Sequence, residues 1–122
     1  MTKKGPEAKV QQDVLNWLTL QPRSQLFAWR NYTGPVVRGN PKEGKMFFTP
    51  NPCPGAPDIE IILNGRYIGL ECKSSKGVQS EAQKTFEHEV KRNGGFYFVI
   101  RSLKDAMDVV KQVQGITCIK DD

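Results

Sequence analysis

The chain has 122 residues, which is the size of one domain, so we expect a single domain over 1–122. Charged residues make up 25% and hydrophobic residues 38%, as in ordinary globular proteins, and no apolar run approaches the ~20 residues of a membrane span. The net charge of +5 excludes an acidic domain and favours a polyanionic partner, of which nucleic acid is the commonest.

Cysteine usage and the start of the chain bear on the compartment. Cys53, Cys72 and Cys118 are odd in number and lack a CxxC spacing, so we expect free thiols in a reducing cytoplasm. A single histidine, His88, disfavours a zinc site and is expected at the surface. The basic first residues lead into no apolar segment, so no signal peptide is predicted.

The first predicted helix begins at Gly5-Pro6-Glu7, because proline suits the first helical position and an acid in the first turn suits the helix dipole. Its apolar residues recur at helical spacing and predict a buried stripe: Val10, Val14, Trp17 and Leu18. Glu7 falls on the same inward face. It is either a solvated first-turn acid or a ligand directed at a metal site.

Gln21-Pro22-Arg23-Ser24 ends this helix, and Leu26 to Asn31 reads as a short strand. Arg30 near its end is either a surface charge or a planar fork that holds a phosphate.

Residues 33–57 are rich in glycine and proline and carry Arg38, Lys42 and Lys45. Loops this long in compact domains are often functional. Lys45 to Thr49 is a possible short strand within the loop. Its two phenylalanines, Phe47 and Phe48, either anchor the loop on the core or contact unstacked bases, and the cations suit a nucleic-acid backbone.

Residues 58–73 are the centre of the prediction. Two β-branched, apolar runs flank Asn64-Gly65, which predicts a hairpin with a two-residue type I′ turn. This turn sets the register: Leu63 faces Arg66, Ile61 faces Ile68, Ile59 faces Leu70, and Asp58 faces Glu71. Because side chains alternate along a strand, one face is apolar throughout: Ile59, Ile61, Leu63, Ile68, Leu70 and Cys72.

The other face of this hairpin carries Asp58, Glu71 and Lys73. Two carboxylates that lie directly opposite each other repel, so a positive group has to compensate. A divalent cation such as Mg²⁺ suits carboxylate and water ligands, and the Lys73 ammonium leans into the same site. The alternative is an exposed hairpin face whose charges are simply solvated.

The C-terminal half predicts a helix, a strand and a second helix. Ser80 to Gln83 fits a capping box for a helix that runs to about Arg92, and Gln83 is either a cap residue or part of the site. Asn93-Gly94-Gly95 ends this helix. Phe96 to Ile100 is a continuous apolar run that predicts a strand buried on both faces.

Ser102 caps the last predicted helix, whose inward residues are Leu103, Ala106, Met107, Val110 and Val113. Residues from Ile116 to Ile119 are expected to add a small edge strand. The order of all elements predicts an α/β sandwich, with helices on the faces of a central mixed β-sheet.

The hairpin also carries a family resemblance. Pro57-Asp58 followed by Glu71-Cys72-Lys73 resembles the PD-(D/E)xK pattern of the restriction-endonuclease-like nucleases. Nearly the whole chain resembles the VRR-NUC family, the virus-type replication-repair nucleases of this superfamily. The matching motifs, in chain order, are Glu7, Trp29-Arg30-Asn31 with Gly34, Gly55-Ala56-Pro57-Asp58, Gly69-Leu70-Glu71-Cys72-Lys73, Ser80-Glu81-Ala82-Gln83, and Gly94-Gly95.

The resemblance implies an αβββαβ core and a nuclease that depends on Mg²⁺ or Mn²⁺. It implies metal ligation by Glu7, Asp58, Glu71 and the backbone carbonyl of Cys72, with Lys73 and Gln83 completing the site. Small members of the family resemble homodimers that cut branched DNA such as four-way (Holliday) junctions, in a bacterial or phage-infected cell. The expected DNA-binding residues are Arg30, Asn31, Arg38, Lys42, Lys45 and Lys76.

Three functions remain open from the sequence. A structure-selective DNA endonuclease ranks first, because a protein that only binds nucleic acid has no need of opposed carboxylates. A non-catalytic nucleic-acid-binding module with this fold ranks second. An endonuclease that is specific for a duplex sequence ranks third, because 122 residues leave little room for a base-reading element.

Overall fold

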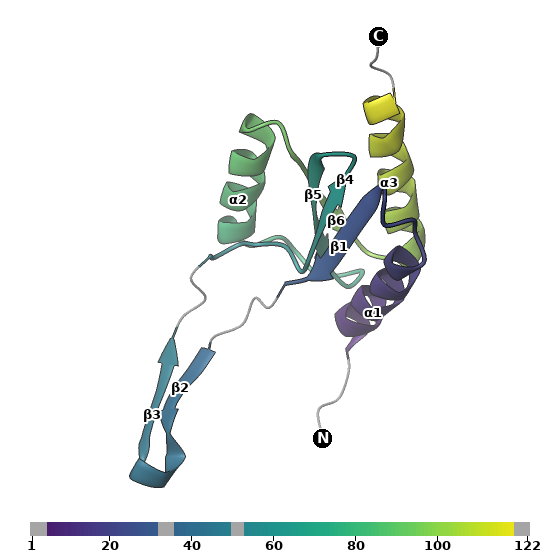
Figure 1. Cartoon of the computed structure of the whole chain (residues 1–122). Helices are drawn as coiled ribbons and strands as arrows, with labels where there is room; N and C mark the ends of the chain where they lie inside the picture. Colours follow the sequence, from purple (N-terminus) through teal and green to yellow (C-terminus); the bar gives the residue numbers. More distant parts are fainter. Residues whose placement is uncertain (1–4, 32–35, 50–52, 119–122) are drawn as a thin grey trace.

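The computed structural model describes residues 5–31, 36–49 and 53–118. Its centre is a four-stranded sheet in the order β1-β4-β5-β6 (Figure 1). The strands are β1 (Leu26–Arg30), β4 (Ile59–Leu63), β5 (Arg66–Cys72) and β6 (Phe96–Ile100). The first three run antiparallel, and β6 pairs parallel to β5. The predicted mixed sheet and α/β class are therefore confirmed.

Helices cover both faces of this sheet. The helices α1 (Pro6–Thr19) and α3 (Leu103–Cys118) lie on one face, and α2 (Glu81–Arg92) lies on the other (Figure 1). The main core lies between the sheet and the α1/α3 layer, where apolar burial supplies the driving force. It contains Val14, Leu18, Leu26, Ile59, Ile61, Leu63, Ile68, Leu70, Cys72, Ile100, Ala106, Val110 and Val113. No helix in the described ranges is both long and apolar enough to cross a membrane.

The β4–β5 hairpin has the predicted turn and register. Asn64 has a φ of 49° and Gly65 a φ of 84°, so both central residues are left-handed, as a type I′ turn requires. Ile59 pairs with Leu70, Ile61 with Ile68, and Leu63 with Arg66. The apolar face is buried throughout, with exposures of 0–1% from Ile59 to Cys72 along that face.

The strand β6 is buried on both of its faces, as predicted, although it lies at the edge of the sheet. Tyr97 and Ile100 point to opposite faces and are 1% and 0% exposed. The Tyr97 ring meets Phe86 of α2 at a centroid distance of 6.1 Å, while Ile100 belongs to the core under α1 and α3. Helices therefore pack against both faces of the sheet at β6.

One predicted element is wrong. Residues 116–118 belong to α3 and do not form an edge strand, and Ile119 lies outside the described residues. The β-branched residues Ile116 and Thr117 favour a strand locally. The helix continues through them because each added residue extends an existing backbone hydrogen-bond ladder at little further cost.

The long segment between β1 and β4 contains a second, separate sheet. The strands β2 (Val36–Asn40) and β3 (Lys45–Thr49) pair antiparallel around the short 3₁₀ helix η1 (Pro41–Glu43). We call residues 36–49 the β-ribbon. It projects from the end of the main sheet at which β1 stops and β4 begins (Figure 1). The prediction of β3 is confirmed, whereas β2 was not predicted.

Gly55 is a position at which backbone conformation and space both demand glycine. Its φ is +85°, and an added Cβ would lie 2.1 Å from the carbonyl oxygen of Ala82 in α2. We expect Gly55→Ala to lower the free energy of unfolding by about 1–3 kcal/mol more than Gly94→Ala does. Gly94 is the matched control, because its φ is +86° but an added Cβ meets nothing within 4 Å. Urea unfolding of both variants measures the difference, and equal losses would contradict the contact between Gly55 and α2.

Candidate active site

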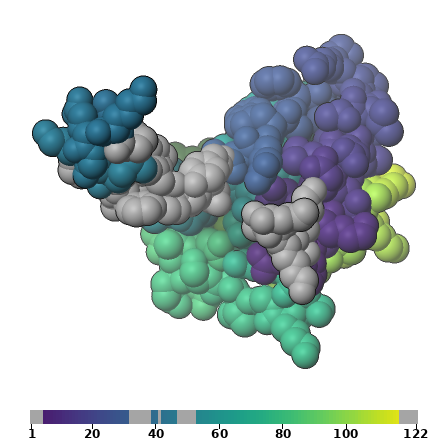
Figure 2. Space-filling view, turned by 90° about the horizontal axis from the view of Figure 1, so that it is seen from below, coloured from purple at the N-terminus to yellow at the C-terminus, as the bar shows by residue number. Residues whose placement is uncertain are grey.

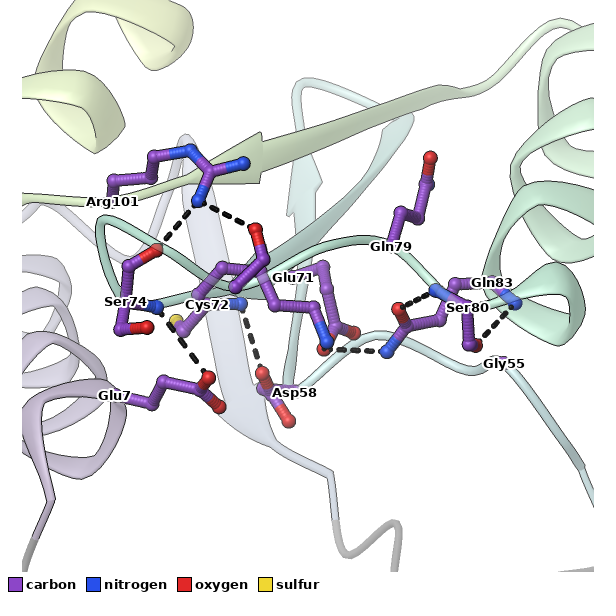
Figure 3. A network of polar contacts seen from close by, with 12 residues as sticks. Glu7, Gly55, Asp58, Glu71, Cys72, Ser74, Gln79, Ser80, Gln83 and Arg101 are labelled. Carbon is purple, nitrogen blue, oxygen red and sulfur yellow. Dashed lines mark hydrogen bonds and ion pairs between the residues drawn. The ribbon is translucent and has the colours of Figure 1, made fainter.

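Two carboxylates meet where β4 begins and β5 ends. The register that pairs Ile59 with Leu70 brings Asp58 and Glu71 together one step further along, on the face opposite the main core. Asp58 Oδ2 accepts a hydrogen bond from the Cys72 backbone N–H at 2.8 Å (Figure 3). The predicted pairing of these two acids is therefore present in the backbone geometry.

Asn31 holds the backbone that leads into Asp58. Its backbone N–H donates to the Asp58 carbonyl at 2.7 Å, and its side-chain Nδ2 donates to the Pro57 carbonyl at 3.2 Å. Pro57 itself is buried and restricts the conformation before Asp58. Asn31 was predicted as a DNA-binding residue. The structure assigns its amide nitrogen to the backbone, and the contact with DNA stays a prediction.

Glu71 is buried, with an exposure of 5%. Its Oε2 accepts a hydrogen bond from Gln83 Nε2 at 2.8 Å and lies 3.7 Å from Lys73 Nζ. Its Oε1 is buried and accepts no hydrogen bond from a donor group of the described residues. Because the pKa of Glu71 is raised, this carboxyl group can hold a proton that it shares with Asp58 when no cation is bound, and a divalent cation could take the place of that proton.

Gln83, which the sequence predicts as either a cap residue or a part of the site, is a cap residue that also contacts Glu71. Its Oε1 accepts from the Ser80 backbone N–H at 2.8 Å, and its backbone N–H donates to Ser80 Oγ at 3.1 Å. This is the predicted capping box of α2. The Nε2 of the same side chain reaches Glu71, so the start of α2 orients the buried carboxylate (Figure 3).

Glu7 approaches the pair from the first turn of α1. Its Oε2 accepts from the Ser74 backbone N–H at 3.4 Å, just beyond the end of β5. A cleft of about 450 Å³ opens here, and its walls include Glu7, Gln11, Arg30 and Asp58. The helix start, the end of β1 and the start of β4 therefore converge on one solvent-accessible site.

The electrostatics of the pair favour protonation. Burial raises the pKa of Glu71 to about 8, and the negative charge of Asp58 adds to the shift, while Lys73 opposes it. Burial also raises the pKa of Asp58, against the lowering effect of the Cys72 N–H. Burial, with smaller effects of the nearby carboxylates, raises the pKa of the Cys72 thiol to about 12, which makes it a poor nucleophile.

These shifts predict a dependence of stability on pH. A carboxyl group whose pKa is raised on folding stabilises the protein below its unfolded value, near 4.5, and this contribution is lost as the pH rises toward about 8. We therefore expect the free energy of unfolding in EDTA to fall between pH 5 and pH 8. Urea unfolding at several pH values tests this, with Glu71→Gln as the control that should flatten the dependence. An equal slope in both proteins would contradict it.

The residues present fit a hard divalent cation. Carboxylate oxygens are its preferred ligands, and Glu71 Oε1 is such an oxygen, to which no donor group of the described residues is hydrogen-bonded. Within residues 5–31, 36–49 and 53–118, no group of three or more His, Cys, Asp or Glu side chains lies close enough to form a metal site. Mg²⁺ commonly binds through one or two carboxylates and keeps several waters, so the Asp58–Glu71 pair meets its needs. Ligation by Glu7 and by the Cys72 carbonyl stays a prediction.

The predicted DNA-binding residues fall into two groups. Arg30 lines the cleft, and Lys76 lies exposed in the turn that follows β5. Lys42 and Lys45 are exposed at the end of the β-ribbon farthest from the main sheet. Arg38 belongs to β2, but its side chain lies outside what the structure describes. Seen from the end of the sheet that carries the site, the β-ribbon stands apart from the body, with a hollow between them (Figure 2).

Three residues around the site were not predicted. Gln11 lies one turn after Glu7 on α1, and this i, i+4 spacing is a signal that the sequence does contain. Ser74 acts through its backbone N–H, and Arg101 acts on the turn after β5. Neither of these last two contacts has a signature in the sequence, because both depend on where the chain folds back.

A larger groove, of about 760 Å³, lies at the other end of the sheet. It is bounded by the Asn64–Gly65 turn and by Phe86, Val90 and Gly94 at the end of α2. It does not include the carboxylate pair. The smaller cleft is therefore the better candidate for chemistry, because its wall includes Asp58, a carboxyl group whose pKa is raised by burial and which adjoins Glu71.

The comparison with solved structures identifies the fold. A protein named "VRR_NUC domain protein" superposes with a TM-score of 0.55 over 91% of this chain and 89% of its own chain. The chain has the VRR-NUC fold. At 18% sequence identity the likeness establishes the fold alone. No protein-family model matches the sequence, and no curated protein matches it.

The VRR-NUC fold gives the predicted architecture its name and agrees with the order of the predicted elements.

Proposed function

We propose that this chain is a Mg²⁺- or Mn²⁺-dependent endonuclease that hydrolyses phosphodiester bonds in branched DNA, such as four-way junctions. The observation that carries the proposal is Glu71 Oε1, a buried oxygen that accepts no hydrogen bond from a donor group of the described residues. It lies in a carboxylate pair with Asp58, and Lys73 is 3.7 Å from the other oxygen of Glu71. This is the donor set that phosphodiester hydrolysis with a hard cation requires.

Each residue has a separate task in this proposal. Asp58 and Glu71 would hold the divalent cation, which supplies Lewis-acid activation of water and charge relief at the phosphate when bound. Gln83 holds the Glu71 carboxylate in place, because its own position is set by the capping box of α2. Lys73 offers positive charge to the phosphate oxygens as they gain charge, and Arg30 in the cleft wall suits a flanking phosphate.

The β-ribbon is the proposed contact to DNA outside the site. In the sequence, the β-ribbon lies between two segments next to the site. Asn31, before it, holds the backbone at Asp58, and residues 53–57, after it, lead into β4. A two-stranded ribbon fits a DNA groove, and Lys42 and Lys45 provide charges for the phosphates. A homodimer with two-fold symmetry would direct two such sites at opposed strands of a junction.

The ribbon contact predicts a salt effect. We expect Lys42→Ala/Lys45→Ala to weaken DNA binding and to reduce the slope of log affinity against log salt by about 1 for each lysine. The turnover of bound DNA should stay unchanged, because neither residue lies at the site. The matched control is Lys104→Ala/Lys111→Ala, which removes two exposed lysines from α3. Equal slopes for these two variants, measured by fluorescence anisotropy, would show that the β-ribbon does not contact DNA.

The proposed activity is tested by cleavage of a panel of labelled DNAs: a four-way junction, a flap, a linear duplex and a single strand. Mg²⁺, Mn²⁺ and EDTA are compared, with Asp58→Ala beside the wild type. We expect metal-dependent cutting of the junction that is lost in Asp58→Ala. Equal cutting by Asp58→Ala would reject the site. Binding without cutting would favour a non-catalytic module, and cutting of the linear duplex at one sequence would favour a sequence-specific enzyme.

The dimer is tested separately by light scattering. We expect twice the mass of one chain, whose calculated mass is 13.8 kDa. A single-chain mass across micromolar concentrations would remove the symmetric two-site arrangement and leave the chemistry of one site untouched.

A further inference from the structure

Arg101 lies directly after β6, beside the turn through which the chain leaves β5. The parallel register pairs Cys72 with Ile100, and the Lys73 backbone N–H donates to the Ile100 carbonyl at 3.0 Å. The residue after Ile100 is therefore brought next to the residues after Lys73. This placement depends on the parallel pairing of β5 with β6, which are far apart in the sequence, so the sequence did not reveal it.

The Arg101 guanidinium closes this turn. Its Nη1 donates to the carbonyl oxygens of Ser74 at 2.5 Å and Gly77 at 2.9 Å (Figure 3). The Gly77 backbone N–H donates to the same Ser74 carbonyl at 3.1 Å. The backbone of Arg101 is held in turn, because its N–H donates to Asp105 Oδ2 at 2.9 Å. One side chain thus ties both ends of the turn to the end of β6.

The same turn holds Glu7. The Ser74 N–H, at the start of the turn, donates to Glu7 Oε2 at 3.4 Å. Gly77, at its end, lies so close that an added Cβ would be 3.3 Å from Glu7 Oε2 and 3.2 Å from the Lys73 side chain. The turn therefore lies against both the Glu7 carboxylate and the Lys73 stem.

We infer that Arg101 is a positioning residue that sets the Glu7 carboxylate through the Ser74–Gly77 turn. The inference rests on the proposed function and on the prediction that Glu7 joins Asp58 and Glu71 as a ligand when a cation is bound. Arg101 forms no ion pair within the described residues. Its guanidinium donates to two carbonyl oxygens of one turn, and this arrangement holds the backbone of the turn in place.

The test compares Arg101→Gln, Arg101→Lys and Arg92→Gln. Arg92 is the matched control, because it is an exposed arginine on α2 that contacts Glu89 and lies outside the turn. Loss of a group that orients a metal ligand costs about 10-fold to 100-fold in metal affinity. We expect Mn²⁺ affinity, measured by electron paramagnetic resonance, to fall about 10-fold in Arg101→Gln, to recover in part in Arg101→Lys, and to stay unchanged in Arg92→Gln.

A double-mutant cycle with Glu7→Ala separates positioning from a general structural effect. If Arg101 acts through Glu7, Arg101→Gln adds no further loss of Mn²⁺ affinity once Glu7 is absent. Losses that add in full would overturn the inference. A second result would also overturn it: Arg101→Gln keeps its Mn²⁺ affinity but has a raised KM for DNA and a shallower slope of log DNA affinity against log salt. Arg101 would then be a contact to DNA phosphates.

Amide hydrogen exchange follows the turn without any cleavage. We expect the Gly77 and Ser74 amides to exchange faster in Arg101→Gln, while the amides of β4 keep their protection, which shows that the fold is intact. Mn²⁺ binding and amide exchange require no DNA. If the wild type binds Mn²⁺ with this dependence on Arg101 but cuts no DNA in the panel, the proposed function fails and the role of Arg101 stands. If instead the protein cuts DNA but its Mn²⁺ affinity does not depend on Arg101, the proposed function stands and the role of Arg101 fails.

Discussion

Glu71→Gln is expected to lower DNA cleavage by about 10³-fold or more and, at the same time, to stabilise the protein in EDTA above pH 8. The amide keeps the volume of the side chain and an acceptor for Gln83, so the fold should be retained. It cannot provide the charged oxygen that a divalent cation requires. Because burial and Asp58 disfavour the Glu71 carboxylate, removing its charge relieves the folded state.

The matched control for this variant is Glu60→Gln. Glu60 lies on β4, and its carboxylate accepts a hydrogen bond from the Tyr67 hydroxyl at 2.9 Å, away from the site. Cleavage rates with Mg²⁺ and urea unfolding in EDTA at pH 9 measure the two effects. Retention of activity in Glu71→Gln, or a loss of stability at pH 9, would contradict the interpretation of Glu71 as a metal ligand whose buried charge lowers the stability of the fold.

Lys73→Met is expected to lower kcat by about 10²–10³-fold while the KM for DNA changes little. The Lys73 side chain is 14% exposed and its ammonium lies 3.7 Å from Glu71, so it is held in the site and not in solvent. A charge that acts on the phosphate as it gains negative charge affects the rate of bound substrate more than its binding. Lys104→Met removes an exposed lysine that pairs with Asp108 on α3 and serves as the control.

Metal affinity distinguishes the two site variants. Glu71→Gln should lose Mn²⁺ binding, because a ligand is removed. Lys73→Met should bind Mn²⁺ at least as well as the wild type, because a positive charge beside the site is removed. Without that charge the pKa of Glu71 should rise further, since Lys73 now lowers it. A loss of Mn²⁺ binding in Lys73→Met equal to that in Glu71→Gln would indicate collapse of the site and not loss of a catalytic charge.

The β4–β5 hairpin could be predicted in detail because its information is local. Asn64-Gly65 specifies one turn, and strict alternation of apolar residues leaves one register that buries a whole face. The capping box at Ser80 and Gln83 is local in the same sense, since its partners are three residues apart. These short-range rules were sufficient to bring Asp58 and Glu71 together.

The elements that were missed or wrong depend on contacts that short-range rules do not describe. The strand β2 contains Gly39 and Asn40, which weaken a strand pattern, and it forms because β3 pairs with it. The end of α3 carries β-branched residues, yet the helix continues through them. Local preference is a weak guide where a neighbouring element already supplies the hydrogen-bonding pattern.

The sequence by itself determined which residues share one face of the hairpin, because turn type and side-chain alternation are properties of adjacent residues. The tertiary structure alone decided how those groups are held: Glu71 Oε1 is buried and accepts no hydrogen bond from a donor group of the described residues, Gln83 spans from its helix to Glu71, and Arg101 braces the turn that holds Glu7. Burial and such long-range hydrogen bonds depend on how separate elements pack against each other. The neighbours of a residue in the sequence do not determine this packing.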